Sequence, residues 1–127
     1  MKVVVDTSII VDYIRVGFGL YEELVILSKK KSVRLYIPTL VILELWKGRS
    51  MGAKDMVSKV ERMLKVCKTL PLTEQIAKHS GELIRNGKFN DFIDASIAAS
   101  AVYLDAQLAT RNKKHFEKVE DLKLFEI

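Results

Sequence analysis

The stretch Lys2-Val3-Val4-Val5-Asp6-Thr7-Ser8 decides the fold that the rest of the chain is expected to adopt. Three β-branched residues in succession are typical of a strand that is buried on both faces in the middle of a parallel sheet. The strand ends at Asp6, and the apolar residues after Ser8 predict that the chain turns into a helix. This places Asp6 at the carboxyl end of a central strand, where ligands bind in open α/β sheets. A simpler interpretation is that Asp6 only caps the following helix, a position that Asp favours.

The composition is that of a single domain spanning residues 1–127, since 49% of the residues are hydrophobic. No apolar run approaches the roughly 20 residues that span a bilayer, so we expect no membrane segment. The one cysteine, Cys67, excludes an internal disulfide and suits a reducing cytoplasm. The formal net charge of +5 favours a polyanionic partner such as nucleic acid, although solvated helix ends would explain the basic clusters equally well.

Hydrophobic periodicity and capping signals predict further strands and helices along the chain. The predicted strands cover 2–5, 32–37, 67–70, 107–110 and 122–125. The predicted helices cover 8–15, 20–31, 40–47, 53–66, 74–86 and 91–105, with N-caps at Thr39 and Thr73 and a polar loop over 111–115. This alternation predicts an α/β fold with a doubly wound, mainly parallel sheet of about five strands.

Two further carboxylates stand out because they interrupt apolar sequence. Glu44 lies in an almost wholly apolar helix, where a charge is costly to bury unless it is paired or bound to a cation. Asp94 lies in the first turn of a predicted helix that is apolar on nearly all sides, and Asp91 precedes it by three residues on the same face. The simpler interpretations are that Glu44 pairs with Lys47 and that Asp91 caps the helix.

The predicted topology brings these acids together. Right-handed crossovers place the strand-to-helix junctions at one edge of a parallel sheet, so Asp6, Glu44 and Asp94 are expected to converge there. Like charges at close range raise one another's pKa, and a divalent cation relieves the repulsion. An all-oxygen set without paired His or Cys ligands predicts Mg²⁺ or Mn²⁺, which suits phosphoryl chemistry. The residues favour a metal-dependent phosphodiesterase or nuclease over three unrelated caps and salt bridges.

The same residues resemble the motifs of the PIN-domain ribonucleases, especially the VapC toxins of prokaryotic type II toxin–antitoxin systems. The resemblance covers essentially the full length, and four motifs in the family's order make it specific although each is weak alone. They are Val4-Val5-Asp6-Thr7-Ser8, Ile37-Pro38-Thr39 through Glu44-Leu45, Asp94-Ala95-Ser96-Ile97-Ala98-Ala99, and Leu108-Ala109-Thr110-Arg111-Asn112 with His115-Phe116.

The resemblance implies a three-layer α/β/α sandwich and a Mg²⁺- or Mn²⁺-dependent endoribonuclease. Asp6, Glu44 and Asp94 would be its catalytic metal ligands, assisted by hydrogen bonds from Thr7, Ser8 and Thr110. A metal-bound water would attack the phosphodiester in line, without using the 2′-hydroxyl. The implied partners are an RNA substrate, a cognate antitoxin whose tail occupies the active-site groove, and a second copy of the chain in a homodimer.

The chain departs from the resemblance at two places where many members carry a fourth acid, which here hold Asn112 and His115. Asn112 still offers an oxygen, and Asp91 or Glu117 is a candidate substitute, so we expect one bound ion and no strongly bound second one. The nearby basic residues are candidate RNA contacts; they are Arg111, Lys113 and Lys114.

Two other functions compete with the nuclease. One is a non-catalytic PIN-like RNA-binding module that keeps the acids without using them. The other is an aspartate-nucleophile phosphatase, which also opens with an apolar strand that ends in Asp. That chemistry needs a second aspartate two residues on, where this chain has Ser8.

Overall fold

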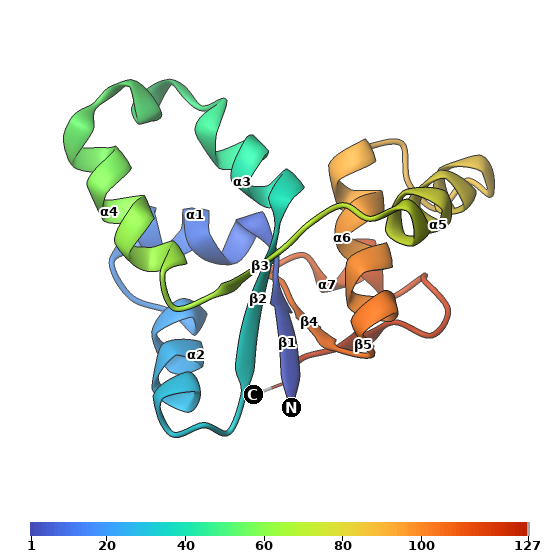
Figure 1. The fold of residues 1–127 in the computed structure, drawn as a ribbon, viewed down its shortest axis with the longest axis horizontal. Helices are drawn as coiled ribbons and strands as arrows, with labels where there is room; N and C mark the ends of the chain where they lie inside the picture. Colours follow the sequence, from blue (N-terminus) through green and yellow to red (C-terminus); the bar gives the residue numbers. More distant parts are fainter. Residues whose placement is uncertain (127) are drawn as a thin grey trace.

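A five-stranded sheet forms the middle of the molecule in the computed structural model, which describes residues 1–126 (Figure 1). The strand order is β3-β2-β1-β4-β5, and every neighbouring pair is parallel. The strands are β1 (Lys2–Val5), β2 (Arg34–Pro38), β3 (Lys68–Leu70), β4 (Gln107–Ala109) and β5 (Lys123–Leu124). The predicted parallel sheet is confirmed, with the opening strand at its centre.

Helices cover both faces of the sheet and give the three-layer sandwich that the motifs implied. Figure 1 shows α1, α2 and α4 on one side of the sheet and α5 and α6 on the other. The helices are α1 (Thr7–Val16), α2 (Leu20–Lys29), α3 (Thr39–Trp46), α4 (Lys54–Leu64), α5 (Glu74–Arg85), α6 (Phe92–Leu104) and α7 (Lys113–Phe116), with a 3₁₀ helix, η1 (Arg49–Gly52). None of these helices, within residues 1–126, has the length and apolar character needed to cross a membrane.

The centre of the core is built from β1 and α6. Val3, Val4 and Val5 are at most 1% exposed because helices cover both faces of their strand. Every residue of α6 from 95 to 101 is buried, and most are small, so this helix lies close to the sheet and to α5. The hydroxyls of Ser96 and Ser100 donate to carbonyls of the same helix, at 2.7 and 2.6 Å, which allows their burial.

The structure corrects three details of the predicted elements. The second half of the polar loop expected over 111–115 belongs to α7, and η1 was not predicted, because a helix of one turn is too short for hydrophobic periodicity to show. Thr73 does cap α5, accepting from the Ile76 N–H at 3.2 Å. Thr39 is not an N-cap: the extended Pro38 takes that position and Thr39 is the first residue of α3.

Candidate active site

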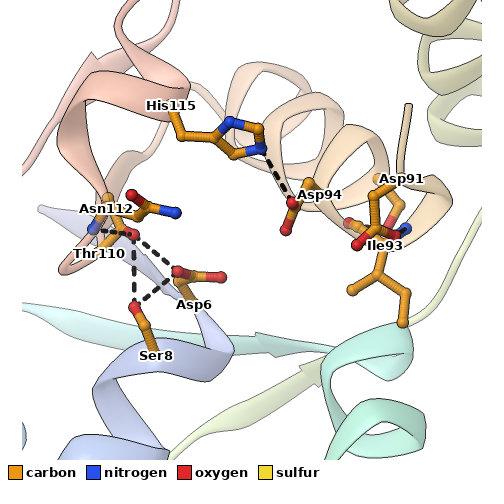
Figure 2. Close-up of polar contacts among 9 residues, drawn as sticks. Asp6, Ser8, Asp91, Ile93, Asp94, Thr110, Asn112 and His115 are labelled. Atoms are coloured by element: carbon orange, nitrogen blue, oxygen red, sulfur yellow. Dashed lines mark hydrogen bonds and ion pairs between the residues drawn. The ribbon is translucent and has the colours of Figure 1, made fainter. Parts of the chain in front are cut away.

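Asp6 lies where β1 meets α1, and its carboxylate is turned toward the neighbouring strand. Its backbone N–H continues the β1–β4 ladder by donating to the Ala109 carbonyl at 3.0 Å. Its Oδ2 accepts hydrogen bonds from Ser8 Oγ at 2.7 Å and from Thr110 Oγ1 at 2.6 Å (Figure 2). Asp6 occupies the N-cap position of α1, but its side chain makes no capping bond, so capping does not account for its carboxylate.

The two hydroxyls that hold Asp6 are themselves oriented by the loop after β4. The Arg111 N–H donates to Ser8 Oγ and the Asn112 N–H donates to Thr110 Oγ1, each at 3.0 Å. With these N–H groups in place, both hydroxyl hydrogens point to the 5%-exposed carboxylate of Asp6. One carboxylate oxygen is thereby fixed, and in Figure 2 the other is directed toward the space below Asp94.

Asp94 lies in the first turn of α6, and its partner is His115 of α7. The Asp94 Oδ2 and His115 Nε2 atoms are 2.9 Å apart (Figure 2). Burial raises the pKa of Asp94; the hydrogen bond from His115 opposes the rise, and the negative charges of Asp91 and Asp6 add to it. Negative charge therefore accumulates at this end of the sheet, as the sequence predicted for converging acids.

A cavity of about 550 Å³ at the carboxyl edge of the sheet brings the three predicted acids onto one surface. Asp6, Glu44 and Asp94 all line it, although β1, α3 and α6 carry them separately. Glu44 forms no ion pair with Lys47 or with any other residue among 1–126. Its half-buried carboxylate instead faces the cavity. The other lining residues include Thr7, Ser8, Arg15 and Asn112 on the polar side, and Val11, Ile14, Leu45, Met51, Met56 and Val60 on the apolar side.

The two candidate substitutes for a fourth acid lie outside this cavity. Asp91 is exposed and caps α6, since its Oδ1 accepts from the Ile93 N–H at 2.8 Å. Its simpler interpretation as a cap therefore accounts for its side chain, and it acts on the site only by raising the pKa of Asp94. Glu117 is exposed and does not line the cavity either.

The predicted RNA-contacting side chains lie at the surface beside the site, and two of them are paired. Arg111 Nη1 is 3.4 Å from Asp12 Oδ2, and Lys113 Nζ is 2.9 Å from Glu126 Oε2. Lys114 is exposed and has no ion pair within residues 1–126. Exposed pairs of this kind contribute little to stability.

The donors lining the cavity fit a hydrated divalent ion. As arranged here, no three His, Cys, Asp or Glu side chains in residues 1–126 are close enough to hold an ion by themselves. Mg²⁺ does not need such a cage, because it keeps several waters and takes one or two carboxylates. Thr7 Oγ1 is buried at the cavity with no hydrogen-bond partner in the described chain, and buried hydroxyls normally have one. Carboxylates, the amide group of Asn112 and a free hydroxyl together form a polar site of the type that suits Mg²⁺ or Mn²⁺.

Acids gathered at the carboxyl edge of a five-stranded parallel sheet define the class of this protein. The chain belongs to the PIN domain family, whose pattern matches residues 3–122. It is similar to a chain of VapBC2 from Rickettsia felis bound to a promoter DNA fragment, with 26% identity, 98% of both chains covered and a TM-score of 0.82.

Two further solved structures are similar over nearly their full length. A chain of VapBC-1 from nontypeable Haemophilus influenzae shares 26% identity, with 99% of this chain and 98% of that chain covered and a TM-score of 0.77. A chain of DNA-bound VapBC from Salmonella typhimurium shares 24% identity, with coverage of 98% and 97% and a TM-score of 0.84. Comparison with curated proteins gives no match. The predicted likeness to VapC-type PIN domains is confirmed.

Proposed function

We propose that this PIN domain is a Mg²⁺- or Mn²⁺-dependent endoribonuclease and the toxin of a type II toxin–antitoxin pair. One observation carries the proposal: Asp6, Glu44 and Asp94, brought from three separate elements, line a single cavity. Membership of the PIN domain family and the likeness to chains of VapBC complexes support it.

Each polar residue of the site has a role in the proposed reaction. A divalent ion bound here would supply an activated water and would neutralise charge on the phosphate. Asp6 and Asp94 would hold that ion, with Asp6 oriented by the hydroxyls of Ser8 and Thr110. Glu44 faces the cavity without an ion pair in residues 1–126 and would be the third ligand of the ion. Arg15 also lines the cavity, where its guanidinium can pair with the phosphate.

The proposed partners fit the surface around the cavity. The antitoxin would block the groove, as the resemblance implies, and the two chains would form a complex that hides the acids. Large apolar side chains exposed on α3 and at the start of α6 suit contact with another chain, either an antitoxin or a second copy; they are Leu43, Trp46 and Phe92, exposed by 52%, 36% and 75%. Light scattering of the purified chain tests the homodimer directly.

The nuclease is tested by incubating the purified protein with a mixed RNA pool in Mg²⁺ or in EDTA. Asp6→Asn and Asp94→Asn remove one charge each from the site, and Asp105→Asn is the matched control. Asp105 is exposed at the end of α6, and its left-handed backbone, at φ 53°, suits Asn as well. We expect cleavage that needs Mg²⁺, is retained in Asp105→Asn and disappears in the other two variants.

Other outcomes of that experiment separate the competing functions. Cleavage that persists in both site variants points to a contaminating nuclease, and the activity then no longer supports the proposed nuclease. Metal binding without any cleavage leaves a nuclease of narrow specificity. Neither cleavage nor metal binding favours the non-catalytic RNA-binding module.

A further inference from the structure

His115 stands where the resemblance predicts an acid, and the structure packs its imidazole between two aromatic rings. The ring packs edge-on against Phe89, with centroids 5.1 Å apart, and against Phe116, at 5.3 Å. Both phenylalanines are buried, at 2% and 1% exposed, and they also contact each other. These two aromatic contacts restrict the ring, although 34% of the His115 side chain stays exposed.

The ring places Nε2 at 2.9 Å from Asp94 Oδ2. The tautomer of His115 decides which atom donates; opposite an ionised Asp94, which only accepts, Nε2 carries the hydrogen. Figure 2 shows the imidazole reaching Asp94 while Asp6 lies below the pair with its second oxygen directed into the same space. His115 therefore contacts Oδ2 of Asp94, and the other carboxylate oxygen remains available to the cavity.

We infer that His115 is a positioning residue that fixes the Asp94 carboxylate and limits the site to one ion. The inference rests on the proposed metal site. In a Mg²⁺ octahedron with bonds of about 2.1 Å, adjacent oxygen ligands are about 3 Å apart, which is close to the Nε2 to Oδ2 separation observed here. A carboxylate oxygen in place of Nε2 would chelate a further ion together with Asp94. With its hydrogen on Nε2, His115 donates to Asp94 and has no lone pair on that nitrogen for an ion.

The inference is tested by titrating the folded, full-length protein with Mn²⁺ and measuring free Mn²⁺ by electron paramagnetic resonance. Three substitutions separate the roles of the ring. His115→Phe keeps the packing on Phe89 and Phe116 and removes the donor, His115→Gln keeps a donor of similar reach and removes the ring, and His115→Glu adds the carboxylate. His79→Glu is the control, since His79 lies on α5 and, unlike His115, has no hydrogen bond or ion pair to Asp94.

We expect one ion per chain for the wild type, for His115→Gln and for His79→Glu, and two ions for His115→Glu. Loss of the donor in His115→Phe should weaken binding by about 10–100-fold, as is usual when a group that orients a metal ligand is removed. The affinity of His115→Gln should be closer to the wild type than to His115→Phe. A purely structural ring predicts the reverse order, because only Phe preserves the packing.

Each contrary result has a distinct meaning. A single ion in His115→Glu, two ions in the wild type, or wild-type affinity in His115→Phe overturns the inference and leaves the nuclease proposal standing. A folded wild type that binds no Mn²⁺ overturns both proposals together.

Discussion

Replacing Thr110 by Val tests how the hydroxyl network holds Asp6 in the absence of metal. Val has nearly the shape of Thr but cannot donate, so Asp6 Oδ2 loses its 2.6 Å hydrogen bond and keeps only the bond from Ser8. The Asn112 N–H loses its acceptor as well. Because Asp6 is only 5% exposed, little water can replace the lost donor.

The expected cost follows from the charge and burial of Asp6. A hydrogen bond to a charged group contributes about 1.5–3 kcal/mol to stability, and the orphaned N–H adds to its loss, so we expect Thr110→Val to cost about 2–3 kcal/mol. With an unfolding entropy of about 2.1 cal/mol/K per residue, a chain of this length should lose about 7–11 °C in Tm.

Differential scanning calorimetry in EDTA measures this change. Thr69→Val is the matched control, because Thr69 lies exposed on β3, and surface substitutions stay within about 0.5 kcal/mol. Introducing Thr110→Val into an Asp6→Asn background should cost less than in the wild type, since the charged acceptor is gone. If Thr110→Val and Thr69→Val melt at the same temperature, the hydroxyl does not hold Asp6 and the account of the site is wrong.

Three more predictions concern the acid, the core and the thiol. Because the pKa of Asp94 is raised in the folded protein, its carboxyl stabilises the fold below the unfolded pKa and loses that contribution as pH rises through the folded pKa. Metal-free Asp94→Asn should therefore have a higher Tm than the wild type at pH 7, and the difference should shrink on acidification. A lower Tm at pH 7 would contradict this. Leu108→Ala in β4, where Leu108 is fully buried, should lower the free energy of unfolding measured in urea by about 2–5 kcal/mol. A loss under about 1 kcal/mol would show that the neighbouring side chains fill the cavity left by Leu108. Burial raises the pKa of the Cys67 thiol to about 12, so iodoacetamide at pH 8 should label it in urea but not in the native protein, as followed by mass spectrometry.

The sequence predicted the parts of the site that depend on strand order. Asp6 could be placed because the valine run marks a central strand, and a parallel sheet puts the ends of its strands at one edge. Glu44 and Asp94 could be identified because burying a charge in an apolar helix is costly unless it is paired or bound to a cation. Those arguments use only local pattern and topology, and the structure places all three acids on one cavity.

The pairing of side chains across the site could not be predicted in the same way. His115 meets Asp94 through the packing of a single-turn helix on Phe89, and Arg111 pairs with Asp12 although 99 residues separate them. Neither contact leaves a periodic or motif signal in the sequence. The choice between helix cap and site residue for Asp6 also depended on the direction of one side chain, which the hydroxyls of Ser8 and Thr110 determine.

The position of β1 between β2 and β4 has a consequence for the order in which the protein matures on the ribosome. Asp6 is synthesised before the residue that orients it, since that hydroxyl comes from Thr110, 104 residues later. The Ala109 carbonyl that accepts its N–H emerges just before. Contacts of such long sequence separation form only after the intervening chain has been released. A nascent chain that ends before β4 therefore carries Asp6 without the hydrogen bonds that orient its carboxylate, so the site is completed only after β4 and Thr110 have emerged.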